Sequence, residues 1–296
     1  MVVPGPGGQA IIDGQPMWRN AMPWKKSSET PNLGGFAETD DVRGGLGWQG
    51  LMNLDAFVKQ GGVYVGAVST AQFAVQFGLT DGVSVNAAGT GSRVVGSLLR
   101  TRIVDDTSPL VYGVIDNLAV YSDSGGSFSV SATAGGRGGG GGGGAAAAGA
   151  GGRGGGAGRP TGRGTPDDPD QPQGMPQLSP KNVAPVRPAG PQPWQYAVPT
   201  EEQMRNPLNI IPPDQRPRVA LRFADQNQLL VSGLLQGGAD IAQRAVVVDV
   251  PVEKGHVVLF ANNPIWRGET LGSYSMVWNA ILNFDSLNAG RKPDAR

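Results

Sequence analysis

A long glycine- and proline-rich segment, residues 132–193, interrupts the chain and is its strongest constraint on folding. It contains the glycine run Gly138–Gly144, the alanine run Ala145–Ala148 and then many prolines. Such a segment buries too little apolar surface to offset the entropy lost on ordering, so we expect a disordered insertion. Any core must then come from residues 1–131 and 194–296. Because the apolar runs after the insertion complete a layer begun before it, the sequence predicts one α/β domain in two parts.

Helices and strands alternate in the first part of this domain. Residues 48–60 carry an apolar stripe at helical spacing that ends at two glycines, and residues 63–68 form a short apolar strand typical of a covered parallel sheet. Residues 71–77 form a second helix, with Ser69 or Thr70 as its cap. This order is typical of a doubly wound α/β fold. Further strands are predicted at residues 83–85, 97–104, 118–121 and 127–131.

The second part ends in the most regular stretch of the chain, Gly255–Phe284. Strands are predicted at residues 219–223 and 229–235, followed by two apolar strands at 245–252 and 256–261 that a tight hairpin joins. A closing helix follows. Its apolar residues recur at helical spacing, so we expect them to form its buried face: Tyr274, Val277, Trp278, Ile281 and Leu282.

The residue types that are missing exclude several kinds of chemistry. The chain has no cysteine and one histidine, His256, so it offers no disulfide, no thiolate metal site and no cysteine nucleophile. A catalytic zinc requires two or three histidine or carboxylate ligands and a general base, so we expect no metal site and a structural role for His256. Lysine plus arginine and aspartate plus glutamate number 24 each, which predicts neither a nucleic-acid nor a membrane partner. No apolar run is long enough to span a bilayer, and the N-terminus lacks the pattern of a signal peptide.

Two groups of polar residues match ligand-binding patterns only in part. The carboxylate pairs Asp40-Asp41, Asp105-Asp106 and Asp167-Asp168 could bind calcium, but none has the spacing of an EF-hand loop, which favours solvated turns. Gly-Arg-Gly tripeptides around Arg137, Arg153 and Arg163 are similar to RNA-binding tails. They lack interleaved aromatic residues and acids follow them, so a linker is favoured over nucleic-acid binding.

The loop before the closing helix is the best candidate for a ligand site. Asn263, Trp266, Arg267 and Glu269 follow a predicted strand, at the end where open α/β sheets place their sites. An internal ion pair between Arg267 and Glu269 that only orders the loop is favoured over a ligand site. Ser69 lies where a nucleophile elbow would be, but the glycines that usually flank that strained turn are missing, which favours a capping role.

Two stretches carry a family resemblance. Residues 40–83 contain Asp40-Asp41-Val-Arg43-Gly-Gly-Leu-Gly47 and continue to Leu79-Thr80-x-Gly82-Val83, and residues 255–270 read Gly-His-Val-Val-Leu-Phe-Ala-Asn-Asn-Pro-x-Trp-Arg-Gly-x-Thr. Together they resemble the C-terminal region of bacterial proteins of the zinc carboxypeptidase (carboxypeptidase A-like metallopeptidase) family. There a catalytic domain precedes a domain similar to class I glutamine amidotransferases.

The resemblance implies a flavodoxin-like layered sheet, incomplete at the N-terminus. It also implies that the cysteine of a working amidotransferase falls near Val68 or Ser69, and its His-Pro-Glu near Asn263-Pro264-Ile265. Cysteine, histidine and glutamate are all missing there, so the triad is absent. Zinc and its ligands would belong to an upstream catalytic domain of the parent protein, and this chain would hold no cofactor.

The expected function is therefore that of a non-catalytic accessory domain, or fragment, of a secreted zinc carboxypeptidase-like protein. Its partner would be the upstream peptidase domain, and its location would be extracytoplasmic, as the resemblance implies. An alternative is an independent hydrolase of a small amide or glycan that uses Ser69 or the loop Trp266–Glu269. Nucleic-acid binding through the glycine–arginine tripeptides is a third hypothesis.

Overall fold

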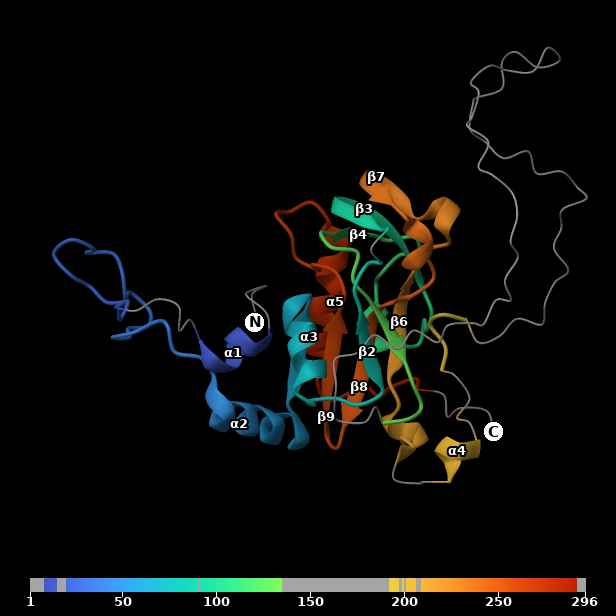
Figure 1. The fold of residues 1–296 in the computed structure, drawn as a ribbon, viewed down its shortest axis with the longest axis horizontal. Coiled ribbons are helices and arrows are strands. Elements are labelled where there is room, and N and C mark those ends of the chain that lie inside the picture. The colour runs from blue at the N-terminus through green and yellow to red at the C-terminus, as the bar shows by residue number, and fades with distance from the viewer. Residues whose placement is uncertain are drawn as a thin grey trace, which may run out of the picture. The chain divides into compact units, whose positions relative to one another are not determined.

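The computed structural model describes residues 8–14, 20–89, 91–134, 192–196, 199, 201–205 and 209–291. The mixed α/β class expected from the sequence is confirmed (Figure 1). The strands are β1 (Val63–Ala67), β2 (Val83–Asn86), β3 (Arg93–Ile103), β4 (Ala119–Ser122), β5 (Ser127–Val130), β6 (Arg218–Phe223), β7 (Leu230–Gln236), β8 (Ala245–Val252) and β9 (Gly255–Phe260). The α-helices are α1 (Gly8–Asp13), α2 (Gly47–Lys59), α3 (Ser69–Gln76), α4 (Glu201–Met204) and α5 (Leu271–Leu282).

The strands form one curled, mixed sheet with the order β1-β9-β8-β6-β3-β4. Off this path, β2 pairs with β5, β5 also pairs with β8, and β7 pairs with β3. Among the described strands only β1 and β9 are parallel, so the doubly wound arrangement suggested by the sequence is limited to this pair. The tight turn between Val252 and Gly255 forces β8 and β9 to be antiparallel, because parallel strands need a long crossover.

Strands from both sides of the predicted insertion share this sheet. β3, before it, pairs with β6 and β7, after it. The first predicted residues of the insertion are part of the fold, since Thr133 bridges Ile210 and the Ala134 amide donates to the Asn209 carbonyl oxygen. The rest of the insertion, residues 135–191, lies outside the described residues.

Two hydrophobic clusters cover the two faces of β1 and β9. Tyr64, Val257 and Leu259 pack in one cluster with side chains of α1, α2 and α3. Val258 and Phe260 point to the other cluster, which contains Met276 and Ala280 of α5. Both strands are therefore covered on both faces, as a parallel pair requires.

The buried face of α5 differs from the one predicted. Its buried residues are Ser273, Met276 and Ala280, whereas Trp278 and Leu282 are 56% and 74% exposed. From Leu271 to Leu282 the helix has no charged residue and is apolar on more than one side, so spacing alone could not identify the buried face. The tertiary structure decides it, because Met276 and Ala280 are the buried residues of the helix that pack in the second hydrophobic cluster.

Candidate functional site

The turn between β1 and α3 has a strained backbone at Val68. This residue has φ 51° and ψ −109°, a conformation rare for any residue with a Cβ and a clear outlier for a β-branched one. The Val68 amide donates to the Phe260 carbonyl oxygen at 2.9 Å, and its carbonyl oxygen accepts from the Gln72 amide at 3.0 Å. The residue is thus held between the end of the sheet and the first turn of α3.

Neighbouring side chains hold this turn in place. The Thr70 hydroxyl lies 2.8 Å from the Ala67 nitrogen and 2.9 Å from the Ala67 carbonyl oxygen. The Tyr64 hydroxyl donates to the Thr70 carbonyl oxygen at 2.8 Å, and burial raises the pKa of Tyr64 to about 12, so the phenol stays a neutral donor. A Cβ on Gly66 would lie 3.0 Å from both the Ala71 nitrogen and the Thr70 oxygen, so α3 can approach β1 only because this residue is glycine.

The prediction that Ser69 caps α3 and that the strained turn is missing is therefore wrong. Ser69 is the first residue of the helix, and Val68 is the N-cap residue, with no side-chain cap. The sequence did contain one signal for the turn: Gly66 stands two residues before Val68, as in the Gly-x-nucleophile part of an elbow motif. The second glycine of that motif is replaced by Thr70, whose hydroxyl bonds to Ala67.

His256 lies far from this turn. The strand register pairs it with Val63 at the start of β1, whereas Phe260 pairs with Ala67 at the end. Four residues of strand separate the two positions by about 13 Å, so His256 cannot act as a base for Ser69. The His256 ring is buried, and its Nδ1 lies 2.7 Å from Asp249 Oδ1.

The candidate loop, Asn263–Glu269, is ordered by an aromatic stack. The Trp266 ring lies parallel to the Tyr121 ring, with 4.7 Å between centroids and 8° between planes. The Arg267 guanidinium lies 4.8 Å from the centroid of the Trp266 ring, in a cation–π contact. Asn263 is buried, and its backbone amide donates to the Tyr121 carbonyl oxygen at 3.2 Å. The stack therefore joins this loop to β4.

Backbone hydrogen bonds complete the loop. The Gly268 amide donates to the Tyr274 hydroxyl at 3.0 Å, and the Glu269 amide donates to the Trp266 carbonyl oxygen at 2.9 Å. Within the described residues there is no ion pair between Arg267 and Glu269, whose side chains are exposed. The favoured interpretation, in which an ion pair between Arg267 and Glu269 orders the loop, is therefore wrong. The stacking of Trp266 on Tyr121 orders the loop instead.

Asn262 is a site residue that the sequence analysis missed. It is 1% exposed, and both polar atoms of its side chain lack a hydrogen-bond partner among the described residues. A buried, unsatisfied amide is unusual and costly in a native protein. It directly follows Ala261 at the carboxyl end of β9, the edge of the sheet where Val68 and the loop also lie. Its position after a buried strand was the available signal.

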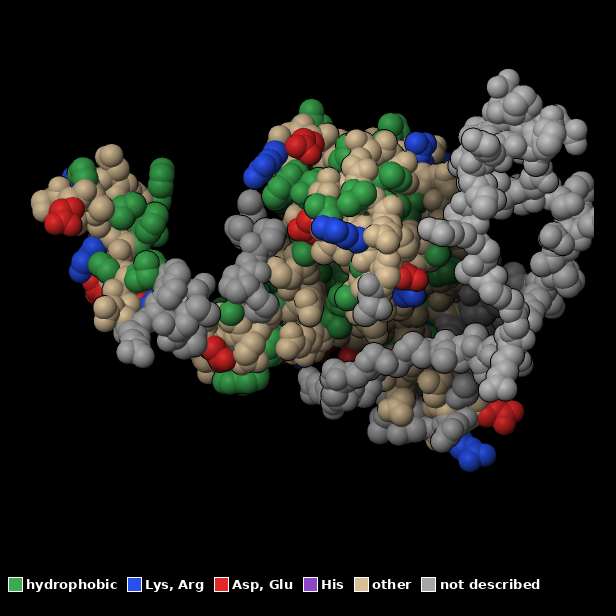
Figure 2. All heavy atoms as spheres, turned by 45° about the horizontal axis from the view of Figure 1, so that its top comes forward, with side chains coloured by type: hydrophobic (Ala, Val, Ile, Leu, Met, Phe, Trp, Pro, Cys, Tyr) green, Lys and Arg blue, Asp and Glu red, His purple; other side chains and the backbone are tan. Residues whose placement is uncertain are grey.

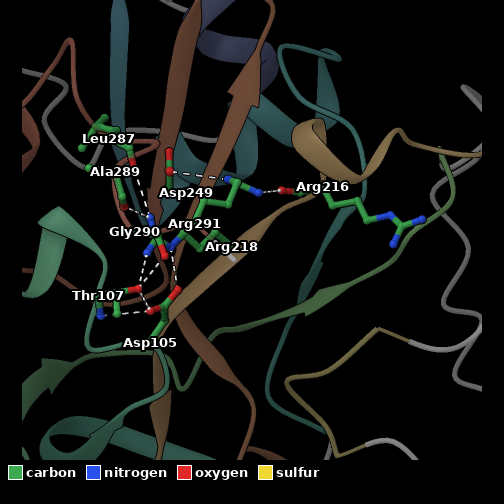
Figure 3. Close-up of polar contacts among 9 residues, drawn as sticks. All are labelled: Asp105, Thr107, Arg216, Arg218, Asp249, Leu287, Ala289, Gly290 and Arg291. Carbon is green, nitrogen blue, oxygen red and sulfur yellow. Dashed lines mark hydrogen bonds and ion pairs between the residues drawn. The ribbon is translucent and has the colours of Figure 1, made fainter. Parts of the chain in front are cut away.

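A second polar cluster, shown in Figure 3, is structural in character. Arg218 is 5% exposed and donates from Nε to Asp105 Oδ2 at 2.7 Å, while its other nitrogens donate to Thr107 Oγ1 and to the carbonyl oxygens of Leu287 and Ala289. Burial alone would raise the pKa of Asp105, but the bonds from Arg218 and Thr107 outweigh it and lower this pKa. The cluster joins the segment after α5 to β6.

The acid pair Asp40-Asp41 is engaged with neighbouring cations. Asp40 pairs with Lys25, and Asp41 with Arg43, which together with the Arg43 amide lowers the pKa of Asp41. Asp167-Asp168 lies outside the described residues. In the part of the chain that the structure describes, no three histidine or acidic side chains are placed to hold a metal ion.

Comparison with known proteins identifies no relative. No family model, no curated protein and no solved structure matches the chain. On the face seen in Figure 2, basic side chains of the described residues are scattered among acidic and uncharged ones. The three Gly-Arg-Gly arginines lie outside the described residues. None of the described helices has the length and apolar character to cross a bilayer.

Proposed function

We propose that this chain is a non-catalytic ligand-binding domain of the class I glutamine amidotransferase-like, flavodoxin-like type. The observation that carries the proposal is the strained backbone of Val68 at the turn from β1 to α3. In an enzyme with a nucleophile elbow, this strain serves to present a nucleophile at the end of the sheet. Here the side chain is an isopropyl group, which has no nucleophilic atom.

The surrounding residues support binding rather than hydrolysis. The sheet position of His256 separates the only imidazole of the chain from the turn. The segment Asn263-Pro264-Ile265, where the resemblance expects His-Pro-Glu, has no general base. A hydrolase that uses Ser69 would therefore lack a histidine partner of the kind a hydroxyl nucleophile needs.

The ligand we propose is a small molecule with an amide and a carboxylate. The exposed Arg267 guanidinium can pair with a carboxylate, and the adjoining Trp266 ring offers an apolar surface. The amide group of the ligand follows from the resemblance to glutamine amidotransferases, and the buried amide of Asn262, whose donor and acceptor have no partner among the described residues, directly precedes this loop. These groups lie beyond the carboxyl end of β9, where open α/β sheets bind ligands.

The protein partner we propose is the catalytic domain of a zinc carboxypeptidase-like parent protein that is exported from the cell. This rests on the resemblance of residues 40–83 and 255–270. Zinc would be bound by that domain. Elemental analysis of the complete parent protein should find zinc and carboxypeptidase activity, and a parent reading frame without zinc ligands would refute the assignment.

L-Glutamine, which carries an amide and a carboxylate, is the probe for the ligand site. Titration followed by tryptophan fluorescence and calorimetry should show binding that Arg267→Ala weakens at least about tenfold, the effect of losing one charge-assisted hydrogen bond. Arg93→Ala, an exposed arginine of β3, is the matched control. Ammonia release from glutamine, or p-nitrophenyl acetate hydrolysis that Ser69→Ala abolishes, would replace the binding proposal by the hydrolase.

A further inference from the structure

Six large apolar side chains form an exposed surface on α5 and beside it, which we call the outer patch. They are between 49% and 74% exposed: Phe57, Leu271, Trp278, Ile281, Leu282 and Phe284. Four of them belong to α5, which carries no charged residue. A helix that is apolar all round is normally buried on all sides. The contacts of α5 with the sheet therefore account for only one of its apolar faces.

A groove lies within the outer patch. It has a volume of about 580 Å³ and is lined by Phe57 of α2, by Val63 and Val65 of β1, and by Ile281 and Phe284 in and after α5. The exposed side chains of Trp278 and Leu282, one helical turn apart, project from the same surface. The patch thus presents a hollow and projections together, which a self-complementary contact requires.

The part of the groove that β1 lines is an unpaired sheet edge. β1 pairs only with β9 among the described strands. The Gly62 carbonyl oxygen accepts from His256 and the Val68 amide donates to Phe260, so the backbone groups of alternate residues face β9. Those of Val63 and Val65 consequently point away from β9, toward the groove. An open apolar edge of this kind is a site of association.

We infer that the outer patch is the contact surface of a symmetric dimer of this chain. A half-exposed large side chain leaves roughly 100 Å² in water, so the six residues provide about 600 Å² on each partner. This reaches the lower end of stable interfaces, about 600 Å² per partner, and equals the largest patches found on monomers. Because α5 carries no charge, the helix itself adds no like-charge repulsion between two copies.

The groove of this surface is separate from the proposed ligand site, whereas Leu271, at the other end of the outer patch, is two residues after Glu269 of the candidate loop. The groove is lined by the first residues of β1 and the last turn of α5, whereas Val68 and the candidate loop lie beyond the carboxyl ends of β1 and β9. Dimerisation and glutamine binding can therefore be tested independently of one another.

Sedimentation velocity over about 1–100 μM protein tests the inference. The unmodified chain should be dimeric, and Leu282→Glu and Trp278→Glu should each weaken the dimer at least about 30-fold, as expected for a central contact residue. Both side chains are exposed, so the monomers should keep their far-ultraviolet circular dichroism. Phe36→Glu adds the same charge at a fully exposed residue outside the patch and should leave the dimer unchanged.

Cross-linking gives a second readout, because the chain has no cysteine of its own. Leu282→Cys should yield a covalent dimer with a short bis-maleimide, and Phe36→Cys should not. A chain that stays monomeric over the whole concentration range overturns the inference and leaves the patch to a different polypeptide or to another segment of this chain. A dimer that survives both glutamate variants overturns it equally.

Discussion

The Val68 amide donates a hydrogen bond of 2.9 Å to the carbonyl oxygen of Phe260, and this bond connects the strained turn to the neighbouring strand. Because the register of β1 and β9 ends at Ala67 and Phe260, this is the last backbone contact of the parallel pair. Hydrogen bonds to the sheet and to the first turn of α3 therefore hold Val68 in this conformation, which its own β-branched side chain disfavours.

Replacing Val68 with glycine should stabilise the protein. A residue with a Cβ in such a conformation costs about 1–3 kcal/mol, which glycine avoids, and part of this gain is offset by the greater entropy of the unfolded glycine variant. We expect Val68→Gly to raise the free energy of unfolding by about 1 kcal/mol in urea titrations. Val65→Gly, in the regular part of the same strand, is the matched control and should lower it. Equal losses in both variants would show that Val68 is not strained.

The ion pair between Asp105 and Arg218 should make stability depend on pH in a defined direction. The folded-state pKa of Asp105 is lowered, so its contribution is fully present above the unfolded value of about 3.9 and is lost as pH falls toward the folded value. Asp105→Asn leaves Arg218 buried without its carboxylate and should cost about 3 kcal/mol at neutral pH. The difference from wild type should shrink in urea titrations near pH 3.

Asp116 provides the control for this experiment. Its pKa is also lowered, since hydrogen bonds from the Ile103 amide and Arg102 outweigh its burial, but its side chain is 52% exposed. Asp116→Asn should therefore cost less than about 1 kcal/mol. A cost as large as that of Asp105→Asn would mean that burial of the arginine is not what makes the first pair important.

The two sides of α5 should respond differently to truncation. Met276 is 1% exposed, so Met276→Ala should cost about 2–5 kcal/mol, measured by thermal or urea unfolding. Trp278 is more than half exposed, and in protein dilute enough to be monomeric Trp278→Ala should cost less than about 1 kcal/mol. If Trp278→Ala cost more than Met276→Ala, the buried face of α5 would be the one predicted from helical spacing.

The aromatic stack should hold the candidate loop to β4. Trp266→Ala removes its contacts with Tyr121 and Arg267 and should lower the free energy of unfolding by about 2 kcal/mol. Hydrogen exchange of the Gly268 amide should also accelerate, because its bond to Tyr274 depends on an ordered loop. Trp24→Ala, which removes a half-exposed tryptophan from another loop, should leave that exchange rate unchanged.

The sequence by itself determined most of the segments that form strands and helices, but neither α1 nor α4 was predicted. The apolar strands of residues 245–252 and 256–261 and their hairpin were predictable because β-branched residues between turn signals have few other solutions. The helix at residues 48–60 was equally clear from its spacing and its terminal glycines. The candidate loop was visible as a loop too, since polar and aromatic residues follow a buried strand, and its ligand stays a prediction.

Only the tertiary structure decided the rest. Spacing could not choose the buried side of α5, because a helix without charge is apolar in several directions; the side that packs in the core carries Ser273, Met276 and Ala280. The conformation of Val68 depends on hydrogen bonds to Phe260 and Gln72, which come from separate elements. Arg218 and Asp105, which form an ion pair, are 113 residues apart in the sequence. Asn262 is buried by residues from other parts of the chain. Such properties depend on which distant segments meet, and no local pattern encodes that.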